Sequence, residues 1–332
     1  MPSEPRHRVL IVGCGELGAR HLQAVGQVES VTAIDVVDPR SGALELGRKR
    51  LAEISSSLRV ETRWLHAIED ASSGDLCIVP TQADVRGEVF RRAVALGYKR
   101  FLLEKIVAPS VREYEEMLAL TRAHGLSVWV NCKSRAYSSY RRIRQSLAPG
   151  EPVTVSVVGG NHGLANNGVH FADLFVFLDG AEAIELIAAD IDSVLHRSKR
   201  GDRIFDLSGR VVARSRKGST FTMVLDGGHM ALPVTSIVSA RYRAVVDDSV
   251  KLFYESVADS PGMPWQWRQI PYDENLMVSH MTQAFAKDIL DRGSCELPTL
   301  DQCFPAHRFI LETLRPHFNR LLHVEAEACP VT

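Results

Sequence analysis

The sequence predicts an α/β protein with two domains, a doubly wound parallel sheet followed by an α/β domain with an open, mainly antiparallel sheet. In the N-terminal part, short apolar runs alternate with helical stretches, and this βαβ pattern implies parallel strands. After about residue 135, strand-like pieces follow one another through short turns, which favours antiparallel pairing with helices on one face. The 332 residues suffice for two cores. We therefore expect domains at 1–132 and 133–332.

The elements of the first domain follow from local signals. RVLIVG (8–13) is a short apolar run ending in glycine, typical of a strand covered on both faces. The stretch 110–125 begins with a serine cap, carries a glutamate three residues later and ends at a glycine, as a helix should. We also expect strands at 30–38, 75–81, 100–105 and 127–132, and helices at 18–28 and 87–97.

The second domain reads mainly as strands. The DGG turn at 226–228 indicates a hairpin between the strands on either side of it. Two helices follow, at 276–293 with a glycine stop and at 304–318. We expect strands at 153–160, 184–191, 210–215, 221–226, 229–234 and 250–256.

Composition excludes several classes of protein. A net charge of −1 and a pI of about 6.9 give no global field for nucleic acid or a membrane surface. No apolar run is long enough for a secretory signal or a membrane span, and the six cysteines form no CxxC pair. We expect a cytoplasmic protein with reduced, largely buried cysteines. The Arg- and Lys-rich stretch 196–217 is interpreted as solvated loops, with docking of a phosphate or another subunit as the alternative.

A glycine-rich loop follows the first strand. Gly13, Gly15 and Gly18 form a GxGxxG that opens a helix. Gly13 allows the tight turn, Gly15 lets the backbone approach a pyrophosphate, and Gly18 lets the helix pack on the sheet. An acid at the end of the second strand, Asp38, is placed to bind the ribose hydroxyls, whereas Asp35 would lie mid-strand. The loop predicts a Rossmann dinucleotide-binding domain; the alternative is a glycine turn that binds nothing.

The choice between NAD and NADP depends on two neighbouring residues. Asp38 favours NAD, because a carboxylate repels a 2′-phosphate. Arg40 and Ser41 could hold that phosphate instead. We favour NAD and leave NADP open. The residues expected to bind the cofactor are Gly13, Gly15, Glu16, Leu17, Gly18, Asp38, Arg40, Thr81 and Glu104.

Two further segments carry chemistry. Glu104 and Lys105 end a parallel strand, where ligands bind in such sheets, although they could also simply solvate the strand end. In LANNGVHFADLFVFL (164–178), Asn166 and His170 share one helix face with Asp173, within roughly 60° of one another. The opposite face is an apolar stripe of Phe171, Leu174, Phe175 and Leu178.

In this order and separation, the glycine loop, Glu104-Lys105 and GVHFAD (168–173) resemble the Gfo/Idh/MocA family of glucose-fructose oxidoreductases, inositol dehydrogenases and rhizopine-catabolism proteins. The resemblance covers nearly the whole chain and includes 130–147, similar to the family's crossover segment. It implies a Rossmann domain with an open-sheet α/β domain, and an NAD(P)-dependent oxidoreductase that acts on CH–OH groups of sugars, cyclitols or nucleotide sugars.

The resemblance assigns roles and shows two departures. The family's Glu-Lys-Pro signature falls on Glu104, Lys105 and Ile106, so isoleucine replaces the proline. Asn166 stands where an aspartate is usual, and an amide cannot accept a proton. His170, with an ordinary pKa of ~6.5, is then the acid/base.

We expect hydride transfer between nicotinamide and a carbon bearing a secondary alcohol. Lys105 polarises the oxygen and His170 moves its proton. Asn166, Asp173 and Arg135 bind neighbouring hydroxyls, and Asn161 and His162 either join the substrate pocket or belong to a loop. No metal-ligand spacing is present, and hydride transfer needs no metal.

Other interpretations stay open. One is a dinucleotide-binding sensor or scaffold without catalysis, which the changes at Ile106 and Asn166 favour and the retained Lys105 and His170 oppose. Another is a dehydrogenase or reductase of a non-sugar substrate. We expect an apolar face of the open sheet to be covered by a second copy, giving a homo-dimer or homo-tetramer. The sequence leaves the substrate and the direction of reaction undecided.

Overall fold

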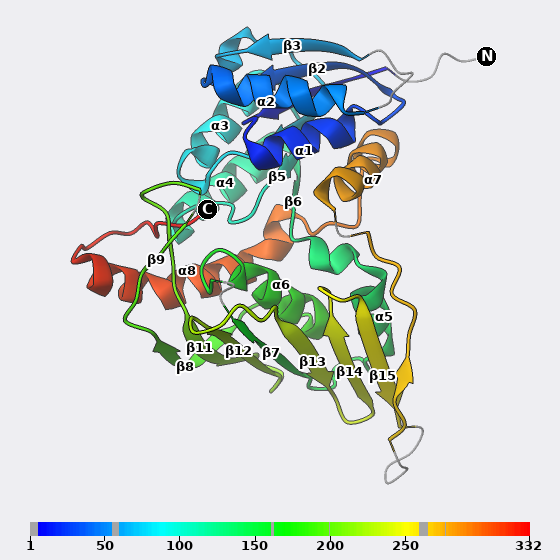
Figure 1. Ribbon diagram of the computed structural model, residues 1–332, viewed down its shortest axis with the longest axis vertical. Helices are drawn as coiled ribbons and strands as arrows, with labels where there is room; N and C mark the ends of the chain where they lie inside the picture. The colour runs from blue at the N-terminus through cyan, green and yellow to red at the C-terminus, as the bar shows by residue number, and fades with distance from the viewer. Residues whose placement is uncertain (1–5, 55–59, 161–162, 199, 259–264, 276) are drawn as a thin grey trace. The chain divides into compact units, whose positions relative to one another are not determined.

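The chain folds into two compact units. The structure is a computed structural model that describes residues 6–54, 60–160, 163–198, 200–258, 265–275 and 277–332 (Figure 1). The first unit comprises Met1–Ala108, Arg112–Asn131 and Asn275–Asp301, and the second comprises Pro109–Val111, Cys132–Glu274 and Gln302–Thr332. The first unit thus takes in a late segment that the expected boundary at residue 132 assigned to the second.

A six-stranded parallel sheet forms the centre of the first unit, as the alternating pattern predicted. Its strand order is β3-β2-β1-β4-β5-β6. The order reverses between β1 and β4, and ligands bind at such a switch point in open α/β sheets. The strands are β1 His7–Val12, β2 Val31–Val37, β3 Glu61–Leu65, β4 Leu76–Val79, β5 Arg100–Leu103 and β6 Ser127–Val130.

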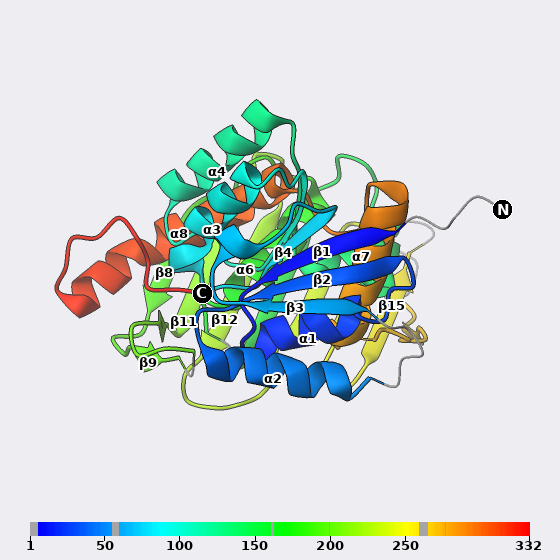
Figure 2. The same ribbon diagram turned by 90° about the horizontal axis from the view of Figure 1, so that it is seen from above.

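Helices cover both faces of this sheet. Figure 2 shows α1 and α2 on one face and α3 and α4 on the other. The late helix α7 packs against α1, where Thr282 Oγ1 lies 2.9 Å from His21 Nδ1 and Gln283 Nε2 donates to the Gln27 carbonyl. The helices are α1 Glu16–Val25, α2 Ser41–Ala52, α3 Ala83–Ala95, α4 Val111–His124 and α7 Val278–Arg292, with a short 3₁₀ turn at Ile68–Asp70.

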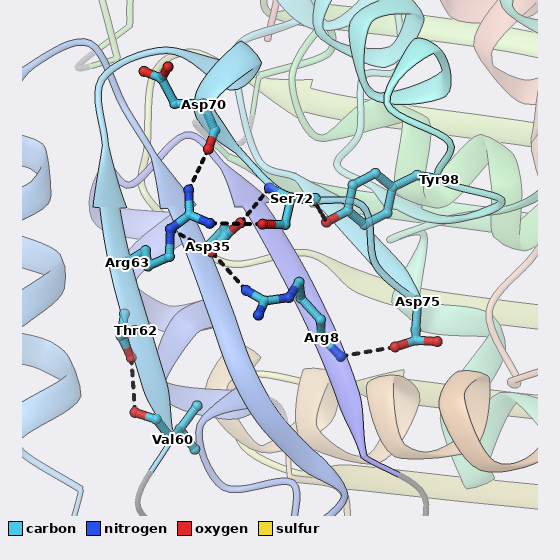
Figure 3. A network of polar contacts seen from close by, with 9 residues as sticks. All are labelled: Arg8, Asp35, Val60, Thr62, Arg63, Asp70, Ser72, Asp75 and Tyr98. Atoms are coloured by element: carbon cyan, nitrogen blue, oxygen red, sulfur yellow. Dashed lines mark hydrogen bonds and ion pairs between the residues drawn. The ribbon is translucent and has the colours of Figure 1, made fainter.

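Asp35 joins β2 to its neighbours inside the sheet (Figure 3). Its buried carboxylate accepts the Ser72 N–H at 2.8 Å and an Arg8 guanidinium N–H at 3.2 Å, and Arg63 lies 3.7 Å away. The Tyr98 hydroxyl donates to the Ser72 carbonyl. A buried carboxylate with several donors ties strands together, so Asp35 belongs to the framework of the sheet.

The second unit contains an eight-stranded sheet of order β16-β15-β14-β13-β7-β12-β11-β8. β12 runs parallel to β7, and the other neighbouring strands pair antiparallel, as expected for this domain. A separate two-stranded hairpin consists of β9 His196–Arg197 and β10 Phe205–Asp206. The sheet strands are β7 Thr154–Gly160, β8 Glu185–Ile191, β11 Gly209–Arg214, β12 Thr220–Asp226, β13 Val234–Val238, β14 Tyr242–Asp247, β15 Leu252–Val257 and β16 Arg268–Gln269.

One face of this sheet is packed and the other is exposed. In β7 and β13, buried and less buried residues alternate, and Val155, Val157 and Ile237 belong to the core. Figure 1 shows α5 and α6 on one face of the sheet. The helices of this unit are α5 Ser138–Ser146, α6 Gly168–Asp179 and most of α8 Leu300–Leu322, with a 3₁₀ turn at Lys133–Ala136.

Three expectations about this unit were wrong. β12 and β13 form no hairpin around the DGG turn, because both pair with β7, one on each side. The segment 229–233 is not a strand; it passes Gly160, whose N–H donates to the Ala231 carbonyl. The helix expected at 164–178 begins only at Gly168, so Asn166 lies in the preceding turn and does not share a helix face with His170.

Local signals were too weak for several elements. The elements that were not predicted are α2, β3, α5, β9, β10, β14 and β16. α5 is rich in arginine and serine and has few apolar residues, and α2 begins without a side-chain cap as a start signal. Five of the six cysteines are buried. In the described part of the chain, no helix is long and apolar enough to cross a membrane.

Candidate functional site

The glycine loop between β1 and α1 has the shape that close approach to an anion requires. Gly13 has φ +103°, a conformation that L side chains rarely adopt. A Cβ on Gly18 would lie 1.9 Å from the Gly13 carbonyl oxygen, so α1 can start here only with glycine. Glu16 begins α1 and is exposed, with Leu17 half-buried beside it. The first N–H groups of α1 are available to an anion.

Asp38 holds this loop to the end of β2. Its Oδ2 accepts the Cys14 N–H at 2.9 Å, and its carboxylate also accepts the Arg40 N–H at 3.0 Å. Arg40 Nε and Nη2 each donate to it at 3.1 Å. Burial raises the pKa of Asp38, but these hydrogen bonds outweigh it and the pKa is lowered. The carboxylate is only 2% exposed, whereas the Arg40 side chain is 72% exposed.

Thr81, after β4, lies against the glycine loop. Its Cγ2 is 3.1 Å from where a Cβ on Gly13 would stand, and its buried Oγ1 has no hydrogen-bond partner among the described residues. A buried hydroxyl without a partner is costly in a protein core and is readily satisfied by a ligand. This orphan hydroxyl beside a glycine cradle fits a dinucleotide. The structure therefore brings Gly13, Gly15, Gly18, Asp38, Arg40 and Thr81 together at the β1–β4 switch point.

Glu104 and Lys105 follow β5 and are both buried. Glu104 Oε1 lies 3.0 Å from His21 Nε2 and accepts a hydrogen bond from Asn131 Nδ2 at 2.5 Å. Burial raises the pKa of Glu104, but His21, Asn131 and the charge of Lys105 together lower it to about 2. The Lys105–Ile106 peptide bond is cis, although Ile106 is not a proline. Glu104 thus fixes the backbone next to Lys105 from inside the unit.

In the second unit, Arg135 and Asp173 form a buried ion pair. Arg135 Nε and Nη2 donate to the two carboxylate oxygens at 2.7 and 2.6 Å, and Nη2 also donates to the Gln302 carbonyl. Burial alone would lower the pKa of Arg135, but the charge and hydrogen bonds of Asp173 have the larger effect and hold this pKa above its usual value. Cys132, Asp173 and Cys303 each bring a ligand-type atom within 4.8 Å of the others. Since both Asp173 oxygens bind the guanidinium, this cluster is not a preformed metal site.

The remaining residues expected in the site lie at the start of α6. His170 is half-buried on its first turn. Asn166 is buried in the turn before it, and its side chain contacts Phe205, Asp206 and Thr332. Asn161 and His162 lie outside the described residues.

Three residues that the sequence analysis did not single out organise these segments. His21 supports Glu104, and the buried Arg86 of α3 donates to the carbonyls of Thr81, Ile106 and Val107. Asp206 of β10 contacts Asn166. Of these three, only His21 and Arg86 could have been found from the sequence, because each is a polar residue among the buried positions of a helix.

Comparisons with known proteins agree with this geometry. Residues 7–132 match the model of an oxidoreductase family with an NAD-binding Rossmann fold, GFO_IDH_MocA. For residues 7–132, the resemblance, the Rossmann fold and the nicotinamide cofactor are thereby confirmed. No curated protein matches the sequence.

Solved structures share the fold over nearly the whole chain. UDP-N-acetylglucosamine 3-dehydrogenase GnnA from Acidithiobacillus ferrooxidans is 15% identical, with a TM-score of 0.68 and 97% of each chain covered. The 3-ketoreductase KijD10 from Actinomadura kijaniata, solved with NADP, is 17% identical, with a TM-score of 0.68 and coverage of 94% and 97%. An NAD-binding oxidoreductase from Klebsiella pneumoniae is 12% identical, with a TM-score of 0.74 and coverage of 94% and 96%.

Proposed function

We propose that this chain is a member of the Gfo/Idh/MocA family of NAD(P)-dependent oxidoreductases and that it transfers a hydride to or from a secondary alcohol or ketone of a sugar, cyclitol or nucleotide sugar. The observation that carries the proposal is the glycine cradle at the β1–β4 switch point, with the orphan Thr81 hydroxyl beside it. Lys105 follows β5 at the same end of the sheet, where a substrate group can be reached.

Two side chains act on the substrate hydroxyl, Lys105 on its oxygen and His170 on its proton. A bound nicotinamide supplies or accepts the hydride. Lys105 donates a hydrogen bond to the substrate oxygen and stabilises the charge that develops on it. His170 takes the hydroxyl proton in oxidation and returns it in reduction. Since Asp173 is fully buried and paired with Arg135, we assign this ion pair to the framework beneath α6 and not to hydroxyl binding.

For the cofactor, we propose NADP over NAD. The sequence favoured NAD because of Asp38, but the carboxylate is buried under donors from Cys14 and Arg40. The exposed group at this end of β2 is the Arg40 guanidinium, whose Nη2 lies 3.7 Å from where a Cβ on Gly15 would stand. A guanidinium binds a phosphate through charge-assisted hydrogen bonds. Arg40 is therefore the group that receives a 2′-phosphate.

Among substrates, we favour nucleotide sugars. The β9–β10 hairpin carries Arg197, Arg200 and Arg203, all exposed, against one exposed acid, Asp202. This hairpin contacts the start of the helix that bears His170 through Asp206. GnnA acts on UDP-N-acetylglucosamine, and KijD10 has been solved with TDP-benzene and NADP. A cationic arm attached to the His170 helix suits the diphosphate of such a substrate.

The test is a panel of UDP- and TDP-sugars, free sugars and cyclitols with NADP⁺ and NADPH, followed by nicotinamide absorbance. We expect turnover with at least one nucleotide sugar. Lys105→Ala and His170→Ala should abolish turnover while NADPH still binds, with Arg48→Ala on α2 as a surface control. Cofactor binding without turnover on any substrate would refute the enzyme and leave a dinucleotide sensor.

We further propose that the exposed sheet face pairs with a second copy of the chain. Val158 of β7 is 55% exposed and lies opposite Val234 of β13, which is 37% exposed. Val238 of β13, four residues along the same strand, is also exposed, at 40%. Apolar residues on neighbouring strands form a patch that a homo-oligomer covers. Sedimentation at micromolar concentration should give a dimer or tetramer, and Val158→Asp should shift it toward monomer; a wild-type monomer contradicts the proposal.

A further inference from the structure

The side chain of Asn166 is fully used inside its own unit. Its Oδ1 accepts the Thr332 N–H at 2.9 Å, and its Nδ2 donates to Asp206 Oδ2 at 2.8 Å and to the Phe205 carbonyl at 3.2 Å. An amide offers two donor hydrogens and one acceptor oxygen. Both hydrogens are taken, the oxygen is engaged, and the residue is 8% exposed. The Asn166 amide therefore binds protein groups and is not available to hold a substrate hydroxyl.

Asp206 accepts hydrogen bonds from backbone N–H groups, one of them in the turn just before α6. Its Oδ1 accepts the N–H groups of Ala165 at 2.9 Å and of Leu207 at 2.8 Å. Gly163 makes this approach possible, because a Cβ there would lie 1.7 Å from Asp206 Oδ2. Burial raises the pKa of Asp206, although Asn166 and the backbone N–H groups oppose that shift. In β10, Asp206 is paired in register with His196, whose Nε2 lies 3.0 Å from Ser208 Oγ.

The same contacts hold the segment 329–332. Besides the Thr332 bond to Asn166, the Pro330 carbonyl accepts the Phe205 N–H at 2.9 Å, and the Cys329 N–H donates to the Pro109 carbonyl at 2.8 Å. Cys329, Val331 and Thr332 are each 4% exposed. Figure 1 shows this segment running back beside the β9 arm. Three parts of the unit far apart in sequence thus meet at Asn166.

We propose that Asn166 and Asp206 form a latch that positions the first turn of α6, and with it His170, and holds segment 329–332 in place. Both are positioning residues, and the part concerning His170 rests on the proposed function. The latch also explains the amide at position 166. An aspartate there would bring two carboxylates within 2.8 Å of each other, and like charges that close repel strongly.

The test is a swap of the two groups. Asn166→Asp creates two facing carboxylates, Asp206→Asn creates two facing amides, and the double variant N166D/D206N restores one acceptor opposite one donor. Asp192→Asn is the matched control, because it removes one charge from the loop next to Ser208 outside the latch. Hydrogen exchange of the Ala165, Leu207 and Thr332 amides reports the latch without any need for turnover.

We expect these amides to exchange about tenfold faster in each single variant, since an unmatched buried pair costs roughly 1–3 kcal/mol. The double variant should exchange more slowly than either single variant but faster than wild type, because the pair regains one donor and one acceptor while the Phe205 carbonyl loses the donor that Asn166 Nδ2 provides. If Asn166→Asp does not fold, Asp206→Asn and the double variant give the same comparison.

Turnover separates the latch from the proposed function. In the single variants kcat should fall with unchanged NADPH affinity, and the swap should restore part of it, since the Phe205 carbonyl stays without its donor. Wild-type exchange rates in Asp206→Asn, or a double variant no better than the singles, would overturn the latch whatever the activity. A wild type without turnover on any substrate would refute the proposed function, while the exchange rates would still decide the latch.

Discussion

Replacing Arg40 by alanine should reverse the cofactor preference. In the structure Arg40 donates two side-chain hydrogen bonds to Asp38 at 3.1 Å, and its side chain, 72% exposed, lies next to Gly15 of the glycine loop. On the proposed assignment, this exposed group meets the 2′-phosphate of NADP, which NAD lacks. Arg40→Ala removes the attraction and leaves the Asp38 carboxylate without its counter-charge, so that the phosphate also meets repulsion.

The magnitude follows from the lost contact. A hydrogen bond between charged groups contributes about 1.5–3 kcal/mol, and each 1.4 kcal/mol changes Kd tenfold. We expect the Kd for NADPH to rise about 10- to 100-fold, and the Kd for NADH to change less than about threefold, because the Cys14 N–H still holds Asp38.

The assay is titration with each reduced cofactor, followed by nicotinamide fluorescence. Arg48→Ala is the matched control, since Arg48 lies on α2, the helix that follows Arg40, with its guanidinium over the Trp64 ring. Equal weakening of NADPH and NADH in Arg40→Ala would mean that Arg40 only shapes the loop. Unchanged NADPH affinity would refute the assignment of the 2′-phosphate to Arg40.

Three other perturbations test the remaining parts of the account. Gly18→Ala should abolish binding of both cofactors in titration, because its Cβ would stand 1.9 Å from the Gly13 carbonyl oxygen; retained affinity would contradict the tight loop. The pKa of Glu104 is lowered from 4.5 to about 2, so its stabilisation, roughly 3 kcal/mol, is present above pH 4.5 and is lost as the pH falls through 2. Glu104→Gln should therefore flatten acid unfolding, followed by circular dichroism, in this range, and an unaltered profile would count against the His21 pairing. Asp173→Asn leaves the buried Arg135 uncompensated and should cost about 3–5 kcal/mol in urea unfolding, whereas a loss below about 1 kcal/mol would show that the pair is not a framework element.

The first sheet and its nucleotide loop could be predicted because their signals are local. The run 8–13 followed by Gly13, Gly15 and Gly18 carries both the strand and the turn within a few residues. Every later strand of this sheet except β3 has its own apolar run. β3, whose first three residues are polar and which is half-exposed, is the one that was missed. Alternation with helices then fixes the parallel class.

The contacts that finish the site could not be predicted because they join distant residues. Asn166 meets Asp206, 40 residues away, and Thr332, 166 residues away. The helical period placed Asn166 on a helix face, but Asp206 accepts the Ala165 N–H and holds that segment as a turn. The hairpin predicted from the DGG turn was wrong for the same reason. β7 lies between β12 and β13, and no local signal indicates that a strand from elsewhere in the chain is inserted there.

The most direct test of dinucleotide binding at the glycine loop is titration of the nucleotide-free wild-type protein with NADPH. Binding is followed by nicotinamide fluorescence, and Gly18→Ala is the comparison. We expect saturable binding at micromolar concentration to the wild type and none to Gly18→Ala. Absence of binding to folded wild-type protein, or equal binding by Gly18→Ala, would contradict it.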